Sequence, residues 1–179
     1  MKIPMILDCT IRDGGYMNNW DFKESVVRDV YRAVSRAGVD YSELGYHGTA
    51  RFFNPDQYGL FRFTPEDALQ RAVQGIQGSR VAIMVDFGRF DPTDLPPRAE
   101  SVAELVRIAV HGDRIREAAE QASTVKEKGY DVSLNLMGYA TYSPTQREEI
   151  KHILADVPLD YVYMADSYGS MFPDQIEPL

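Results

Sequence analysis

Short apolar runs of strand length alternate along the chain with longer stretches in which apolar residues recur at helical spacing. Strands that are covered on both faces are nearly all apolar, and the helices that cover them show a 3.6-residue period. The alternation therefore predicts a parallel α/β architecture. The expected strands are residues 3–7, 39–44, 81–85, 106–110, 132–136 and 161–165.

Local signals mark the helices between these strands. Asp21 with Glu24 three positions later is the pattern of a helix cap, and Ser143 with Gln146 is a capping box. Asp113 is expected to cap a third helix that ends at Gly129. The helices are expected at residues 22–37, from 64–67 onward, 99–105, 113–128 and 143–156, with a further element from residue 173.

Polar side chains fall at or near the ends of the expected strands. These side chains are Asp13, Glu43, Asp86, His111, Asn135 and Asp166. In a (βα)8 barrel the reactive face is built from the carboxyl ends of the strands. An open doubly wound sheet also binds ligands at that edge, so the pattern does not select the barrel. The first strand-to-helix turn lacks the G-x-G-x-x-G spacing of a dinucleotide site, which counts against a Rossmann fold.

Composition narrows the class of protein. The chain has 179 residues, of which 44% are hydrophobic, so one domain over residues 1–179 is the default. A net charge of -8 argues against a nucleic-acid partner. No apolar run approaches the ~20 residues of a membrane span, and no secretory signal is present. With one cysteine, Cys9, no internal disulfide can form, and we expect a cytoplasmic protein.

The most informative segment follows the first expected strand, where Arg12 and Asp13 precede two glycines. A carboxylate can hold a hard divalent cation through oxygen, and a guanidinium beside it can stabilise an enolate or a carboxylate. A bare Arg-Asp-Gly run is otherwise typical of a solvated turn. The preceding apolar strand, with Asp8 and Thr10, favours the site.

Residues 8–15 (Asp-Cys-Thr-Ile-Arg-Asp-Gly-Gly) resemble the first-strand signature of the DRE-TIM metallolyases. This superfamily contains 3-hydroxy-3-methylglutaryl-CoA lyase, isopropylmalate synthase and 4-hydroxy-2-oxovalerate aldolase. Glu43 matches the second-strand glutamate of the superfamily. Residues 163–171 and 108–111 are similar to the sixth and fourth strands of the 4-hydroxy-2-oxovalerate aldolase branch.

The resemblance implies a TIM barrel that makes or cleaves a carbon-carbon bond next to a 2-oxo acid. In this interpretation Asp13 binds Mn²⁺ or Mg²⁺, Arg12 stabilises the enolate of a 2-oxo acid such as pyruvate, and Glu43 tunes the shell of the metal. The substrates would be a 4-hydroxy-2-oxo acid, or pyruvate and an aldehyde. Tyr16 stands where the aldolase branch has a catalytic histidine, so it is the candidate acid-base residue or, alternatively, a loop aromatic at the barrel mouth.

The resemblance also implies parts that the sequence does not contain. Members of the superfamily complete the metal site with His-x-His on the seventh strand, and this chain ends before that strand. Because a full barrel takes about 250 residues, we expect six of eight βα units, in a domain truncated at its carboxyl end. The alternatives are a Claisen-type acyl-CoA lyase or synthase of the same superfamily, and a non-catalytic barrel fragment that assembles through unpaired edge strands, as a homo-oligomer for example.

Further residues are candidates for substrate contacts: His47, His111, Asn135, Asp166 and Ser167. His47 follows the second expected strand and would face the barrel mouth, whereas His152 is expected on an outer helix face. Each candidate also has an ordinary structural interpretation as a hydrogen-bonded interior residue. The aromatic loop over residues 46–63 is interpreted as a lid over substrate, an oligomer contact, or packing over the barrel end.

Overall fold

The computed structural model describes residues 4–176. It contains one six-stranded sheet in which neighbouring strands follow chain order and every pair is parallel. The strands are β1 (Leu7–Asp8), β2 (Tyr41–Tyr46), β3 (Arg80–Asp86), β4 (Ala103–His111), β5 (Asp131–Met137) and β6 (Tyr161–Met164). Of the first expected strand, Ile3 lies outside the described residues, and residues 4–6 are not part of β1, which begins only at Leu7.

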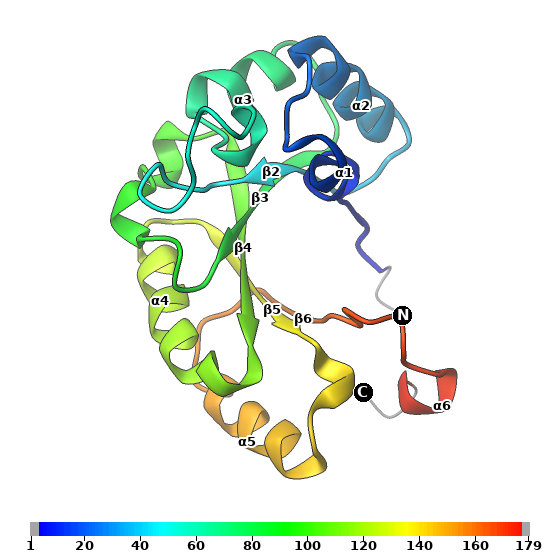
Figure 1. The fold of residues 1–179 in the computed structure, drawn as a ribbon, viewed down its shortest axis with the longest axis vertical. Coiled ribbons are helices and arrows are strands. Elements are labelled where there is room, and N and C mark those ends of the chain that lie inside the picture. The colour runs from blue at the N-terminus through cyan, green and yellow to red at the C-terminus, as the bar shows by residue number, and fades with distance from the viewer. Residues whose placement is uncertain (1–3, 177–179) are drawn as a thin grey trace.

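Helices cover the convex side of this sheet. They are α2 (Glu24–Arg36), α3 (Glu66–Val73), α4 (Ile115–Glu127) and α5 (Pro144–Leu154). Two shorter helices, α1 (Thr10–Asn18) and α6 (Pro173–Ile176), follow β1 and β6 and lie outside this layer. Figure 1 shows α2, α3, α4 and α5 in an arc around the curled sheet. A doubly wound sheet reverses its strand order and carries helices on both faces. The sequential order with a one-sided helical layer is therefore the first six strands of a TIM-type barrel, and the barrel prediction is confirmed.

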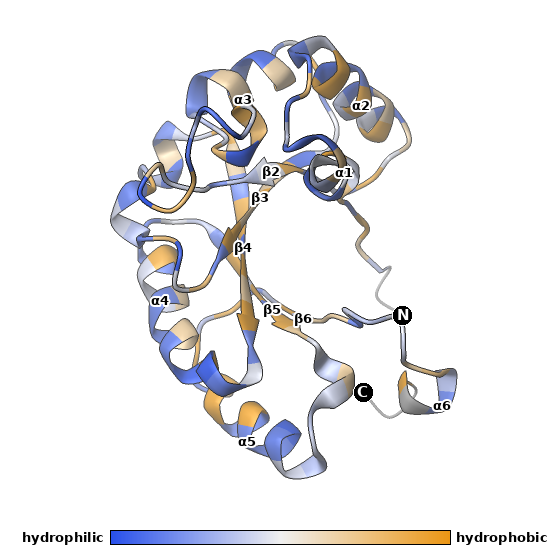
Figure 2. Cartoon of the chain, viewed as in Figure 1, coloured by the Kyte–Doolittle hydropathy of each residue, from blue (hydrophilic) through white to orange (hydrophobic). Residues whose placement is uncertain are grey.

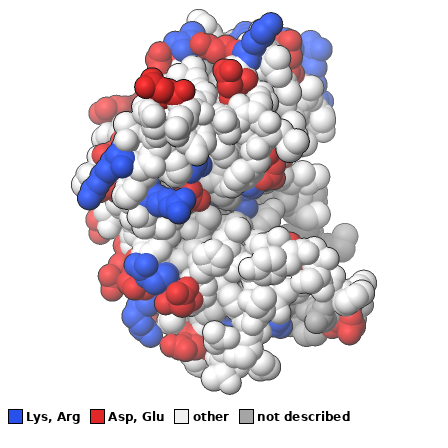
Figure 3. Space-filling model, in the orientation of Figure 1, with Lys and Arg blue, Asp and Glu red and all other residues white. Residues whose placement is uncertain are grey.

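The core lies between the sheet and the helical arc. Residues Val81 to Val85 of β3 are all buried, as expected of a strand covered on both faces. Figure 2 shows the strands mainly orange and the outer surfaces of the helices mainly blue. Basic and acidic side chains lie next to one another along the helical rim in Figure 3. No helix within residues 4–176 has the length and apolarity needed to cross a bilayer.

The predicted start of the first helix was wrong. Residues 10–18, expected as a loop, form α1, and α2 begins only at Glu24 without a side-chain cap. Asp21 does not cap α2, because Lys23 occupies the N-cap position; Asp21 lies in the turn after α1, where its backbone N–H donates to Asn18 O at 3.1 Å. Asn19 and Trp20 have φ values of 55° and 59°, and this left-handed turn redirects the chain. As a result Val27, rather than Val26, faces the core.

Two further helix predictions need correction and one is confirmed. Of residues 99–105 only the first two are helical, in a 3-10 turn over Arg98–Glu100, and Ala103 begins the nine-residue strand β4, which pairs with β3 and β5. Asp113 does not cap α4, which begins at Ile115 after a turn of 3-10 helix. Ser143 and Gln146 form the predicted capping box, with Ser143 N–H donating to Gln146 Oε1 at 2.9 Å.

The adjacent glycines of α1 give a matched pair of tests. A Cβ on Gly14 would lie 3.6 Å from the nearest side-chain atom, whereas a Cβ on Gly15 would lie 2.1 Å from the Trp20 ring. Gly14→Ala is therefore expected to stabilise the protein by up to about 1 kcal/mol, because alanine favours helix. Gly15→Ala is expected to destabilise it by about 2 kcal/mol, because the ring must move. Urea unfolding of both variants checks this, and equal effects would contradict the packing of Trp20.

Candidate active site

A cavity of about 1050 Å³ lies at the carboxyl ends of the strands, where the sequence places its polar residues. The predicted site residues that line it are Arg12, Asp13, Tyr16, His111, Asn135, Asp166 and Ser167. Glu43 lies behind Arg12 and is completely buried. His47 is outside the cavity lining. The structure thus brings most of the predicted residues to one concave surface.

Arg12 enters the cavity from the first turns of α1. Its Nε donates to Glu43 Oε2 at 2.7 Å, and its Nη1 forms an ion pair with Asp13. Trp20 anchors this turn, because its indole Nε1 donates to the backbone carbonyl of Arg12 at 2.9 Å. Burial disfavours the charged guanidinium, but the Glu43 carboxylate more than offsets this, so the pKa of Arg12 is raised. Arg12 is therefore a fixed, permanent cation.

Glu43 is shared by two arginines. Nη1 of Arg107, on β4, lies 3.0 Å from both carboxylate oxygens of Glu43, and Nη2 of Arg107 donates to Asn135 Oδ1 at 3.1 Å. Arg107 is 3% exposed, and its guanidinium carbon lies 4.5 Å from the centroid of the Tyr163 ring. A network thus links Arg12 to Asn135 across the interior of the half-barrel.

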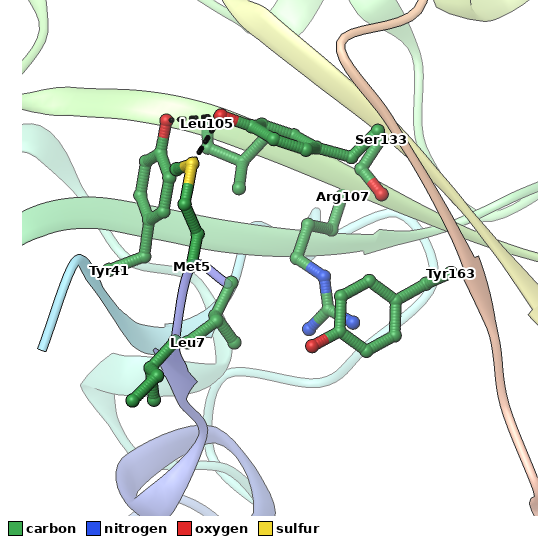
Figure 4. Close-up of a pocket in the computed structure, with 9 residues that line it drawn as sticks. Met5, Leu7, Tyr41, Leu105, Arg107, Ser133 and Tyr163 are labelled. Atoms are coloured by element: carbon green, nitrogen blue, oxygen red, sulfur yellow. Dashed lines mark hydrogen bonds between the residues drawn. The ribbon is translucent and has the colours of Figure 1, made fainter. Parts of the chain in front are cut away.

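Arg107 also lines a second, small pocket of about 50 Å³. Figure 4 shows its guanidinium beside the Tyr163 ring, with Met5, Leu7 and Tyr41 forming the opposite side. Arg107 and Tyr163 line both the small pocket and the main cavity. They therefore lie between the reactive end of the half-barrel and its apolar interior.

Arg107 was not among the site residues predicted from the sequence. The signal was present, because Arg107 is the only charged residue in the otherwise apolar run over residues 105–110. A charge inside a covered strand requires a buried partner. That partner could not be named, because Glu43 is on β2 and β3 lies between the two strands.

Two tyrosines meet beside Arg12. The hydroxyl oxygens of Tyr16 and Tyr46 are 2.7 Å apart, and the Arg12 guanidinium carbon lies 5.9 Å from the centroid of the Tyr46 ring. Burial, followed by the hydrogen bond with Tyr16, raises the pKa of Tyr46. Tyr46 therefore keeps its proton at neutral pH. The exposed Tyr16 is the member of the pair that a substrate can reach.

Each histidine has a different environment. The ring of His47 packs against Phe90 with centroids 6.4 Å apart, and burial lowers its pKa. His111 is exposed at the end of β4 and lines the cavity. His152 is exposed on α5. Of the three, only His111 lies where it can contact a ligand in the cavity.

Asp166 and Ser167 stabilise the turn after β6. The Asp166 carboxylate accepts hydrogen bonds from the backbone N–H groups of Met171 at 2.9 Å and Ser170 at 3.0 Å, and these bonds lower its pKa. Ser167 Oγ accepts a hydrogen bond from Gly138 N–H at 2.9 Å. Both side chains therefore have structural partners, although both also line the cavity.

Cys9, which follows β1, gives a direct test of the buried network. Burial, followed by the negative charge of Glu43, raises the pKa of the Cys9 thiol to about 11. Because only the thiolate reacts, we expect alkylation of folded protein near pH 8 to be on the order of 100-fold slower than in concentrated urea. The rate should rise with pH up to the raised pKa. Iodoacetamide labelling followed by mass spectrometry measures it, and equal rates would contradict the burial.

No family model matches the chain, but curated relatives do. The 4-hydroxy-2-oxovalerate aldolase of Brevibacillus brevis is 30% identical over 172 residues, which are 96% of this chain and 50% of the relative. 4-hydroxy-2-oxovalerate aldolase 6 of Rhodococcus jostii is 28% identical over 93% of this chain and 47% of its own length. The chain therefore spans about half the length of the curated relatives that it matches.

Solved structures agree with this similarity. The N-terminal domain of a "putative aldolase" from Bacteroides vulgatus matches with a TM-score of 0.81 and 28% identity, over 98% of this chain and 58% of that one. These relatives and structural neighbours support the DRE-TIM metallolyase superfamily that the sequence resembles. The HMG-CoA lyase of Bacillus subtilis, with a TM-score of 0.67 and 14% identity over 99% of this chain and 64% of that one, shares the fold.

The described residues of this chain do not make a metal site by themselves. Within residues 4–176 there is no cluster of three His, Cys, Asp or Glu side chains that could hold an ion. Asp13 is exposed, lines the cavity and is ion-paired with Arg12. One carboxylate is a poor site for a transition metal, although hydrated Mg²⁺ binds through one or two. Asp13 is therefore at most one ligand of an incomplete set.

Proposed function

We propose that this protein is a carbon-carbon lyase of the aldolase type, which makes or cleaves a 4-hydroxy-2-oxo acid through the enolate of a 2-oxo acid such as pyruvate. The observation that carries the proposal is the Arg12 guanidinium, which Glu43 fixes at the wall of the cavity. The names of the relatives in Brevibacillus brevis and Rhodococcus jostii support the same reaction class.

In the synthetic direction the enolate carbon attacks the aldehyde carbon, and the carbonyl electron pair moves to the aldehyde oxygen, which takes a proton. Arg12 would donate hydrogen bonds to the enolate oxygen and stabilise its negative charge. Glu43 holds the guanidinium in place and, because it is shared with Arg107, neutralises only part of the combined positive charge. Arg12 would therefore be oriented before the substrate arrives.

We assign proton transfer to Tyr16. Its hydroxyl lies on the cavity wall and is backed by Tyr46, which can donate a hydrogen bond to it. Such a relay would stabilise charge on the Tyr16 oxygen while a proton moves. His111 and Asn135 would contact the polar groups of the substrate, and Asp166 and Ser167 would shape the wall at the end of β6.

Mn²⁺ or Mg²⁺ is proposed as cofactor on the basis of the superfamily resemblance, with Asp13 as one ligand. When bound, such an ion would polarise the 2-oxo acid as a Lewis acid. We further propose that the protein works in the cytoplasm on small molecules, without nucleic-acid or membrane partners, as a single domain that forms homo-oligomers.

Deuterium exchange into the methyl group of pyruvate tests this proposal, because exchange requires enolisation but no aldehyde. The expected result is exchange that depends on added Mn²⁺ or Mg²⁺ and stops with a chelator. Adding acetaldehyde or acetyl-CoA then separates an aldol reaction from a Claisen reaction. No exchange with either metal would refute the proposed lyase and favour a binding or assembly module.

A further inference from the structure

A second arginine, Arg62, lines the cavity and is not used by the proposed chemistry. Arg62 follows β2 in a turn of 3-10 helix and is 4% exposed. Its guanidinium carbon lies 3.8 Å from the centroid of the Phe53 ring, 4.1 Å from that of Tyr46 and 5.0 Å from that of Trp20. Aromatic rings therefore enclose this cation and keep most water away from it.

The hydrogen-bonding capacity of Arg62 is only partly used. Nη2 donates to Asp86 Oδ2 at 3.0 Å, whereas the buried Nε has no hydrogen-bond partner. A buried donor without an acceptor carries a desolvation cost, which a ligand oxygen would remove. Since Arg62 lines the cavity, such an oxygen has a route to it.

Arg89 places a second cation close to the first. It lies in the turn after β3, where its backbone N–H donates to Asp86 O at 3.0 Å, and it lines the same cavity. Its guanidinium carbon is 6.0 Å from the centroid of the Phe53 ring that also contacts Arg62. None of the carboxylates in the described part of the chain pairs with Arg89. Of these two arginines only Arg62 is paired with a carboxylate, that of Asp86, so no ion pair in the described part of the chain neutralises the charge of Arg89.

This charge lies close to the proposed enolate position. The guanidinium carbons of Arg12 and Arg62 are both within 6 Å of the centroid of the Tyr46 ring. Both arginines line the same cavity, so the far end of a molecule that reacts beside Arg12 would extend toward Arg62. Arg89, on the exposed side of Phe53, would meet the same end from the solvent.

We propose that Arg62 and Arg89 form an anion subsite for the second substrate, so that the preferred aldehyde carries a carboxylate or a phosphate group. This inference rests on the proposed lyase function and specifies its substrate class. Guanidinium groups bind both anions through paired, charge-assisted hydrogen bonds. The aromatic walls strengthen these bonds, because charges interact more strongly where water is excluded.

Charged and neutral aldehydes of similar size test the subsite. With pyruvate as the first substrate, kcat/KM is compared for succinic semialdehyde against butanal and for glyceraldehyde 3-phosphate against glyceraldehyde. A larger ratio in the first pair indicates a carboxylate subsite, and a larger ratio in the second pair indicates a phosphate subsite. Arg89→Gln is expected to lower kcat/KM for the preferred charged aldehyde about tenfold and to leave the neutral aldehydes within about twofold. Arg51→Gln is the matched control, because Arg51 stacks on Phe52, next to Phe53 in the loop after β2, and lies outside the cavity lining.

A binding measurement separates this inference from the proposed function. Calorimetric titration with succinate and with inorganic phosphate measures anion binding without turnover. The anion that binds the wild type more tightly should bind Arg89→Gln at least fivefold more weakly than it binds Arg51→Gln. If Arg89→Gln weakens anion binding in this way but the wild type turns over no aldehyde, the proposed lyase function is refuted and the anion subsite is retained. Turnover that is equal for charged and neutral aldehydes, with anion binding unchanged in Arg89→Gln, would overturn the subsite. Arg62→Lys, which keeps the charge but loses the planar fork, should reduce the preference in the same direction.

Discussion

Replacing Arg12 by alanine is expected to lower the rate of pyruvate enolisation by about 10²- to 10³-fold, the usual effect of removing one fixed donor to a developing oxyanion. The guanidinium lines the cavity and is held by Glu43 at 2.7 Å. The charge of Arg12 is permanent, since its pKa is raised. The loss should therefore appear across the accessible pH range. Deuterium exchange into pyruvate measures the rate without an aldehyde.

Two variants make the result specific. Arg12→Lys keeps the charge but loses the planar group that contacts Glu43, so we expect an intermediate loss. Arg71→Ala removes an exposed arginine whose partners are Glu24 and Asp67, far from the cavity lining, and should retain the full rate. Arg12→Ala leaves Glu43 paired with Arg107, so the variant should still fold. A rate near that of the wild type in Arg12→Ala would refute its role.

Sequence patterns correctly predicted those parts of the fold that depend on interactions between residues close together in the chain. Apolar runs located most of the sheet, and the capping box at Ser143 located the start of α5 because both of its hydrogen bonds lie within four residues. The fold of α1 was missed for the opposite reason. Gly14 and Gly15 favour a turn on their own, and the helix that contains them depends on the packing of Trp20 against Gly15.

The candidate site also has one part that the sequence predicted and one part that it did not. The motif around Arg12 and Asp13 could be recognised in the sequence, because its residues are adjacent. The pairing of Glu43 with Arg107 could not be predicted, because it depends on the register between strands. Glu43 pairs with Ala82 of β3, which in turn pairs with Leu105 of β4, so Arg107 must reach across a whole strand. Periodicity along one strand does not encode which side chains meet across two others.

The same network makes Arg107 the residue whose loss should most reduce stability. Arg107→Met is expected to lower the free energy of unfolding by about 3 kcal/mol, because it leaves Glu43 completely buried with Arg12 as its remaining cation. The change also removes the hydrogen bond from Arg107 to Asn135. Urea unfolding of the purified variant measures the loss.

The buried charge, rather than the lost volume, should account for most of this effect, and a double variant distinguishes the two. Methionine fills much of the space of arginine, so in Arg107→Met the main defect is the carboxylate of Glu43. Glu43→Met combined with Arg107→Met removes that carboxylate and leaves Arg12 paired with Asp13. We expect the double variant to be more stable than Arg107→Met alone, because an apolar pair can replace a buried ion pair. Arg71→Met, at an exposed ion pair, is the matched control and should have a much smaller effect. A loss in Arg107→Met no larger than in Arg71→Met would show that Glu43 does not depend on Arg107.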